Sequence, residues 1–310
     1  MAPGTLPIDK SFKDQREAAS LNWSYQLDPL TTHTLGAGYS QELDFQSLSV
    51  NTAISRDFND KNTTLSAGLN LEYDVISPIG GAPVAMSDYA LFEKEGDKSK
   101  QVQDVLLGVS QVMGRRWITQ VNWSLDKSSG YQNDPYKVLS ALDAVGNTIG
   151  YVYEKRPTDH SRASLYWGNK IALDHDTIDF SMRHMTDDWG ITSNTVDLRY
   201  RWMLPNNSYL EPQFRYYEQT AADFYRLYLQ QGAPLVSYAS ADPRLGQFTA
   251  STIGFKWGTK PSRTSEFSVR VQSYVQNGAT PDVSLPALQG LDLYPSLRST
   301  LLQVGFKVDF

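Results

Sequence analysis

Arginines and carboxylates share one side of an alternating pattern between residues 175 and 219, and the pattern returns near residue 270. Guanidinium groups in such a row can bind anionic groups, and charges that line a pore can select ions by their sign. The same groups can instead pair across neighbouring strands and brace a wall, and the near balance of the two signs favours this interpretation. The candidate residues are Asp179, Arg183, Asp197, Arg199, Arg201, Glu211, Arg215 and Arg270.

In the segments that must position these residues, apolar and polar side chains alternate with a period of two residues. From Leu302 to Phe310 every even-numbered position is apolar, and every position between is polar or glycine. Two such faces are typical of a β-strand between two different environments. Thirteen segments repeat the alternation, and their length of about ten residues or more suits tilted membrane-spanning strands. The segments are 16–27, 33–41, 45–57, 63–76, 99–113, 116–127, 160–172, 175–186, 192–204, 208–219, 246–258, 263–276 and 298–310.

The connections between these segments are unequal in length. Short polar turns, such as the one at Asn59–Asp60, alternate for the most part with the longer loops 77–98, 128–159, 220–245 and 277–297. Outer-membrane barrels arrange periplasmic turns and extracellular loops in this way, with aromatic girdles near the strand ends. The sequence therefore predicts an all-β fold, an antiparallel up-and-down transmembrane β-barrel in the bacterial outer membrane. A soluble β-sandwich, which also alternates apolar and polar positions, is the alternative.

The number of segments is odd, whereas bacterial single-chain barrels have an even number of strands and both termini in the periplasm. Counting back from the C-terminus places the start of the first segment outside, which would leave an open sheet edge in lipid. We therefore expect a barrel of about 14 strands, of which about 13 are in this chain; a miscount by one is the alternative. Residues 1–15 are then the tail of an extracellular loop, and residues 16–310 form the barrel.

Composition excludes several classes of protein. The 310 residues carry a formal net charge of −6 and no Cys, so nucleic-acid binding, disulfides and thiolate chemistry have no support. No apolar run is long enough for a transmembrane helix. The four histidines show no metal-ligand spacing, and no phosphate-binding glycine loop occurs, so no metal or cofactor is expected. Ser181 and His184 lie three residues apart and face opposite sides of a strand, so they do not form a catalytic pair.

Seven peptides, which together reach over nearly the whole chain, are informative: GYSQELDFQSLSV (38–50), RDFNDKNTTLSAG (56–68), SQVMGRRWITQVNWSL (110–125), GYQNDPYKVLS (130–140), YEKRPTDHSRASLYW (153–167), DDWGITSNTVDLRYRW (187–202) and LEPQFRYYEQTAADFY (210–225). In this order they resemble a bacterial outer-membrane family, the domain of unknown function 3570. The resemblance implies an outer-membrane barrel whose members begin with a signal peptide and an earlier strand and loop. It implies no activity, although the proximity of such genes to those of flavin-transferring and thioredoxin-like envelope proteins hints at extracytoplasmic redox chemistry.

Two groups of side chains are candidates for function. The inward face adds Glu72, Asp74, Asp104, Asp126, Arg162, Lys170, Lys256, Glu266 and Lys307 to the eight residues above. Loop and rim positions can mark a binding surface, or can pack the loops down over the mouth of the barrel, which turn chemistry favours. These positions are Tyr131, Asp134, Tyr136, Arg156, Asp187, Asp188, Trp189, Phe224 and Tyr225.

The expected function is that of a passive channel or transport barrel for small hydrophilic solutes or ions, embedded among outer-membrane lipids. The alternative is a non-conducting scaffold whose lumen or loops hold a periplasmic redox or lipoprotein partner. An outer-membrane enzyme is the third and least favoured class, and we expect no enzymatic activity.

Overall fold

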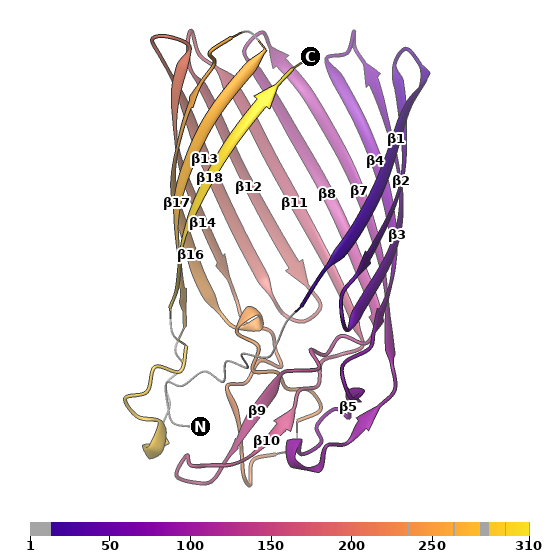
Figure 1. Cartoon of the computed structure of the whole chain (residues 1–310), viewed down its shortest axis with the longest axis vertical. Helices are drawn as coiled ribbons and strands as arrows, with labels where there is room; N and C mark the ends of the chain where they lie inside the picture. The colour runs from indigo at the N-terminus through magenta and orange to yellow at the C-terminus, as the bar shows by residue number, and fades with distance from the viewer. Residues whose placement is uncertain (1–13, 235, 263, 280–284, 295, 310) are drawn as a thin grey trace.

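The computed structural model describes residues 14–309 except 235, 263, 280–284 and 295. Thirteen long strands form one sheet in which each strand pairs antiparallel with the next long strand along the chain (Figure 1). The strands are β1 (Glu17–Asp28), β2 (Thr31–Gln41), β3 (Phe45–Phe58), β4 (Thr63–Ile76), β7 (Lys98–Gly114), β8 (Trp117–Gly130), β11 (Asp159–Ala172), β12 (Thr177–Asp187), β13 (Thr192–Leu204), β14 (Ser208–Gln219), β16 (Phe248–Thr259), β17 (Ser265–Gly278) and β18 (Leu297–Val308). Each lies within three residues of a predicted segment, so the predicted fold class is confirmed.

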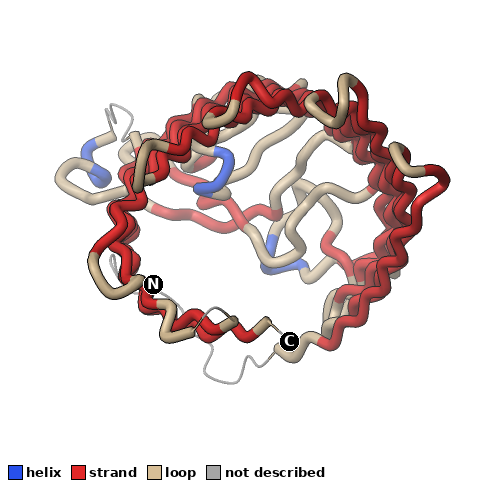
Figure 2. The backbone as a smooth tube through the Cα atoms, turned by 90° about the horizontal axis from the view of Figure 1, so that it is seen from above, coloured by secondary structure: helices blue, strands red, loops and turns tan. Residues whose placement is uncertain are grey.

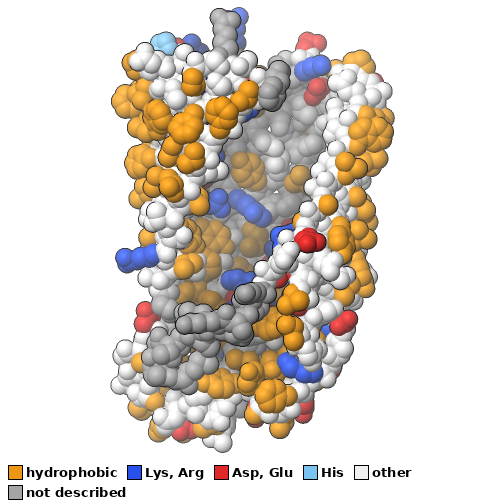
Figure 3. Space-filling view, viewed as in Figure 1, with side chains coloured by type: hydrophobic (Ala, Val, Ile, Leu, Met, Phe, Trp, Pro, Cys, Tyr) orange, Lys and Arg blue, Asp and Glu red, His pale blue; other side chains and the backbone are white. Residues whose placement is uncertain are grey.

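The two faces of the sheet have opposite chemistry. On β13 the apolar side chains face outward, and Leu198 and Trp202 are 42% and 52% exposed. Asp197, which precedes Leu198 and faces the interior, is buried. Figure 3 shows apolar side chains covering the outside of the sheet and Lys and Arg side chains on its inner wall. Lipid, rather than protein, is the environment that such an outer face requires.

The sheet curls into a ring that does not close among the described residues (Figure 2). Its edge strands β1 and β18 are the first and thirteenth of an alternating series and therefore run in the same direction. The fourteenth strand stays a prediction. Residues 1–13 of the predicted loop tail lie outside the described residues.

Tryptophans mark the end of the barrel that carries the short turns. Trp23, Trp117, Trp202 and Trp257 point outward, are 40–61% exposed, and lie near the turns that join their strands. This arrangement matches an interfacial girdle, in which indole rings sit at the level of the lipid headgroups. Trp123 lies in the middle of β8 and is not part of the girdle.

The four long loops fold together at the other end of the barrel into a unit that we call the cap. It contains a sheet of β10 (Thr148–Tyr153), β9 (Val138–Leu142) and β15 (Tyr228–Gln230), and a hairpin of β5 (Ala82–Pro83) and β6 (Lys94–Glu95). Three short 3-10 helices complete it: η1 (Tyr89–Leu91), η2 (Pro243–Leu245) and η3 (Pro286–Leu288). Most buried apolar side chains of the chain lie here, including Leu139, Leu142 and Ala239. In Figure 2, loop segments of the cap cross the interior of the ring.

No helix in the described part of the chain is long and apolar enough to cross a membrane.

Candidate functional site: a charged lumen wall and a loop cap

A cavity of about 530 Å³ lies against the inner wall from β8 to β17. Both carboxylates and guanidinium groups line it, beside polar groups such as Gln120 and Tyr166. Arg183 and Arg215 are inward in phase but lie closer to the cap and do not line this cavity. Six of the eight candidate residues named first line it, together with the predicted inward residue Lys170. These six are Asp179, Asp197, Arg199, Arg201, Glu211 and Arg270.

Ion pairs join these residues along and across the strands. The carboxylate of Glu211, which is 5% exposed, accepts from Arg201 at 2.7 Å and lies 3.6 Å from Arg270. Arg199 approaches Asp197 at 3.1 Å, and Gln213 donates to the same carboxylate at 2.8 Å. One carboxylate shared by two arginines leaves a local excess of positive charge on this wall, so the cavity is charged although most of its groups are paired.

Tyr209 closes the end of this wall nearest the short turns. Its side chain is 1% exposed, and its hydroxyl donates to Glu266 at 2.6 Å. The guanidinium carbon of Arg201 lies 4.5 Å from the centre of the ring, and the Lys256 ammonium lies 5.3 Å from it, which places two cations on one aromatic ring. The ring lies against Gly258, where an added Cβ would come within 2.3 Å of it. Glycine is therefore required for this packing.

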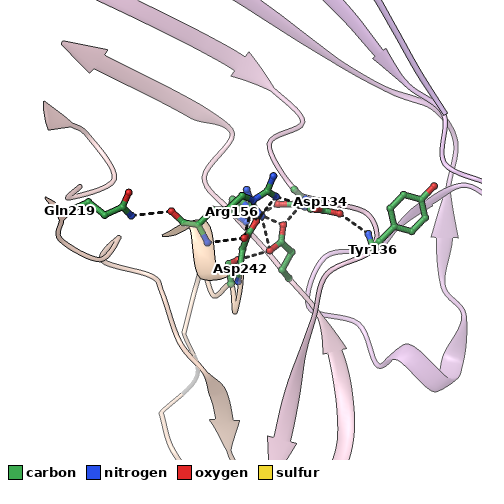
Figure 4. Close-up of polar contacts among 9 residues, drawn as sticks. Asp134, Tyr136, Arg156, Gln219 and Asp242 are labelled. Carbon is green, nitrogen blue, oxygen red and sulfur yellow. Dashed lines mark hydrogen bonds and ion pairs between the residues drawn. The ribbon is translucent and has the colours of Figure 1, made fainter. Parts of the chain in front are cut away.

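A buried ionic cluster, which we call the cap hub, holds the long loops together (Figure 4). Arg156, 10% exposed, donates to Asp242 at 2.9 Å and to Glu154 at 3.1 Å, and both carboxylates are 1% exposed. Glu154 also accepts from the Ser240 hydroxyl and from the backbone N–H of Asp134, each at 2.5 Å. The hub thereby ties the β8–β11 loop to the β14–β16 loop, 86 residues apart in the sequence.

The other long loops join the same unit. Met86 donates its backbone N–H to Tyr153 at 3.2 Å, which ties in the β4–β7 loop. Ala287 donates to the carbonyl of Val145 at 2.9 Å, and the Tyr294 hydroxyl donates to the carbonyl of Pro243 at 2.5 Å, which tie in the β17–β18 loop. No loop of the cap is therefore independent of the rest.

The two hub carboxyls are shifted in opposite directions. Burial raises the pKa of Glu154, and the Arg156 charge and the Ser240 hydrogen bond only partly oppose this. Burial would also raise the pKa of Asp242, but hydrogen bonds from Arg244 and the charges of Arg244 and Arg156 outweigh it and lower that pKa to about 2. The ionised form of Asp242 is therefore favoured by the folded cap, and that of Glu154 is disfavoured.

These shifts predict how the cap responds to acid. The ionised Asp242 stabilises the folded cap above its ordinary pKa of 3.8, and this contribution disappears as the pH falls toward about 2. Glu154 is protonated at a higher pH than Asp242. This protonation does not destabilise the folded cap, because folding raises the pKa of Glu154. We expect amide protection in β9 and β10 to hold down to about pH 4 and to fall below it, measured by hydrogen exchange corrected for intrinsic rates. Loss of protection between pH 7 and 5 would contradict this assignment.

The predicted rim residues pack the loops together. Trp189 and Phe224 belong to a buried apolar cluster with Ile191, Ala222 and Leu245, against which Tyr225 packs. Asp187 accepts backbone N–H bonds from Trp189 and Ile191 at the β12–β13 turn, and Asp188 accepts one from Ser161. The structure thus places these five of the nine rim residues, Asp187, Asp188, Trp189, Phe224 and Tyr225, where loop folding requires them.

The remaining rim residues lie at the border between the cap and the wall. The Tyr136 hydroxyl donates to Asp44 in the β2–β3 turn, and Asp134 and Arg156 belong to or adjoin the hub. Tyr131, Asp134, Tyr136 and Arg156 line a second cavity of about 450 Å³, shared with the outer ends of β3, β4 and β7. Burial and the Asp44 contact raise the pKa of Tyr136 to about 12, so its hydroxyl keeps its proton.

His160 takes a structural position. His160 is stacked on Trp189 with ring centres 3.8 Å apart, and its Nε2 lies 2.9 Å from Asp187. In the described ranges no group of three or more His, Asp and Glu side chains is placed to hold a metal ion.

Sequence reasoning missed Tyr209 and most of the hub. Tyr209 has the inward phase of β14, a signal that was available in the alternation. Glu154, Ser240, Asp242 and Arg244 lie in loops, where no period reveals which side chains meet.

Comparison with known structures relates the chain to outer-membrane barrels. The siderophore receptor PirA from Acinetobacter baumannii has a TM-score of 0.51 at 10% identity, with 94% of this chain and 50% of that chain covered. A mutant of the ferric enterobactin receptor PfeA from Pseudomonas aeruginosa, in complex with enterobactin, gives 0.55 at 9% identity, with 85% and 43% covered. The CymD monoaromatic hydrocarbon channel gives 0.45 at 8% identity, with 96% and 86% covered. The chain thus spans about half the length of the two receptors, and at such identities the likeness shows the fold alone.

No curated protein matches the chain. A match to a family of proteins of unknown function, DUF3570, covers residues 1–308. Because the match includes nearly every residue, and because the fold is that of bacterial outer-membrane β-barrels, the chain belongs to the family DUF3570.

Proposed function

We propose that the protein is a passive diffusion channel of the outer membrane for small hydrophilic solutes or ions. The charged wall of β12–β17 forms its selectivity region, and the cap controls access to it. The observation that carries this proposal is the cavity of about 530 Å³ on the inner wall, which is lined mainly by polar and charged groups. A lumen built only as a brace would be filled by its own side chains.

Conductance of the full-length protein in planar bilayers tests the proposal. We expect steady openings, with a selectivity set by Arg199 and Arg201, whose side chains are 41% and 36% exposed to the lumen. Replacing both with Ser removes two positive charges from the wall, so the cation-to-anion permeability ratio should rise about twofold or more. The reversal potential in a salt gradient measures this ratio. An unchanged value would remove both residues from the selectivity region.

A non-conducting scaffold is the second candidate, and the cap favours it. Four loops interlocked by a buried hub can present a fixed surface to a partner and keep the mouth closed. A folded protein that stays silent in bilayers, with the hub intact and also with it broken, would support the scaffold and contradict the channel.

A further inference from the structure

Two lumen carboxylates on one side of the barrel have no ion-pair partner among the described residues. Glu72 on β4 and Asp104 on β7 both have the inward phase, and Asp104 lies directly across the β7–β8 ladder from Asp126. Asn70 donates to Asp104 at 2.9 Å, but no cation of the described chain lies within ion-pair distance of Glu72 or Asp104. A like-charge pair directly opposite in a ladder is unfavourable. This side of the lumen is therefore electronegative, and we call it the acidic wall.

Two lumen arginines on other strands likewise have no ion-pair partner among the described residues. Arg183 on β12 and Arg215 on β14 are exposed and inward in phase. Arg183 donates to the Ser164 hydroxyl at 3.3 Å, and neither arginine forms an ion pair with any residue that the structure describes. With the arginines that share Glu211, they make this side electropositive, and we call it the basic wall.

The two walls lie on different sides of the ring. In the sheet order, β4 and β7 are the fourth and fifth strands, β12 is the eighth and β14 is the tenth. Arg183 therefore lies three strands from Asp104, and Arg215 lies five strands from it and six from Glu72. Glu72, Arg183 and Arg215 all lie four residues from the cap ends of their strands, and Asp104 lies six from that end of β7. Between the acidic wall and the open edge, the inner faces of β1–β3 carry small uncharged groups such as Asn22, Gly36 and Asn51. Arg16, directly before β1, lines one cavity with Glu72, but its ion pair is with Glu42 at 3.5 Å.

We propose that the outer half of the lumen selects small zwitterionic solutes, those that carry an ammonium and a carboxylate on one molecule. The field between the two walls orients such a solute, with its ammonium toward Glu72 and Asp104 and its carboxylate toward Arg183 and Arg215. A simple anion or cation gains attraction from one wall and repulsion from the other, whereas a zwitterion gains from both. The inference rests on the proposed channel function and names its substrate class.

Osmotic swelling of proteoliposomes that hold the full-length protein tests this with two isomers. Alanine is zwitterionic and lactamide is neutral, although they share one molecular formula and nearly one size. We expect alanine to enter about threefold faster than lactamide, the ratio that modest, water-exposed charge interactions give. The Glu72→Gln/Asp104→Asn variant and the Arg183→Gln/Arg215→Gln variant should each bring the ratio close to one.

Combining all four substitutions separates this mechanism from simple ion selectivity. The acidic-wall variant should shift the reversal potential toward anions and the basic-wall variant toward cations, so the combined variant returns close to the original value. Its alanine preference should stay lost. The control, Asp60→Asn/Lys61→Gln in the β3–β4 turn, removes one charge of each sign outside the lumen and should retain the preference.

Three results would contradict different parts of the proposal. Entry of both isomers at equal rates in the unmodified protein would overturn the zwitterion inference and leave the channel standing. Entry of neither isomer, in vesicles that contain folded protein, would overturn the channel and the inference with it. Retention of the alanine preference in the combined variant would show that these four residues do not produce it.

Discussion

Replacing Arg156 with Ala is expected to break the hub and to loosen the packing of the long loops in the cap. The substitution leaves Glu154, which is 1% exposed, as a buried carboxylate without its cation, and it leaves Asp242 with Arg244 alone. Breaking a buried ion pair by removing one partner costs roughly 3–5 kcal/mol, which is a large part of what a loop unit of this size can supply. We expect a larger single-channel conductance, and rapid tryptic cleavage after Lys137 and Lys155, which lie in the β8–β11 loop.

A matched control comes from an ion pair at the opposite end of the barrel. Arg116 and Asp174 lie 2.7 Å apart, but their side chains are 63% and 78% exposed. Exposed pairs contribute little, so Arg116→Ala should leave both the conductance and the cleavage pattern unchanged. If Arg156→Ala behaved like Arg116→Ala, the hub would not be what holds the loops, and the apolar cluster around Trp189 would be the next candidate.

A charge on the lipid-facing side of the sheet should have the second large effect. Leu198 lies in the middle of β13 and points outward. An arginine at this depth of an outer-membrane barrel costs about 2–4 kcal/mol, because its guanidinium must lie in hydrocarbon. We expect Leu198→Arg to lower the unfolding midpoint in urea, followed by the change in gel migration between the folded and heat-unfolded forms.

Ser181→Arg provides the comparison. Ser181 pairs with Asp197 across the ladder from β12 to β13 and faces the lumen, so the same side chain enters water beside a carboxylate. This variant should unfold within error of the unmodified protein. Equal destabilisation by both substitutions would mean that the assignment of inner and outer faces is wrong.

The alternation of side chains was enough to predict the barrel because only one arrangement satisfies it. A one-residue shift of β13 would move Leu198 into the lumen and Arg199 into lipid, so the apolar pattern sets the register of every strand. The same rule predicted the inward phase of the lumen residues, including Glu72 and Arg215. It could not predict that Glu211 meets Arg270 as well as Arg201, since Arg270 lies on β17, two strands from β14.

The contacts between loops of the cap could not be predicted from the alternation of side chains. Arg156 is one of the predicted rim residues, but its partner Asp242 is 86 residues away in another loop. No periodicity links the two loops, and turn chemistry sets only local backbone geometry. The charge distribution over the whole lumen could not be predicted either. Acids and bases are nearly equal in number between residues 179 and 215, and the positive excess of that wall depends on Arg270 of β17, which shares Glu211 with Arg201. The unpaired acids lie on β4 and β7, far from this wall in the sequence.

The interlocking of the four loops has a consequence for how this protein can diverge. Surface loops usually accumulate substitutions and insertions one at a time, because each rests on the scaffold alone. Here a substitution at Asp242 alters the hub that contains Glu154, and one at Val145 alters the contact with Ala287. Substitutions in one loop therefore require compensating substitutions in another. Related chains should therefore vary in correlated sets at the face that the cell presents to its surroundings, which slows the diversification of that face.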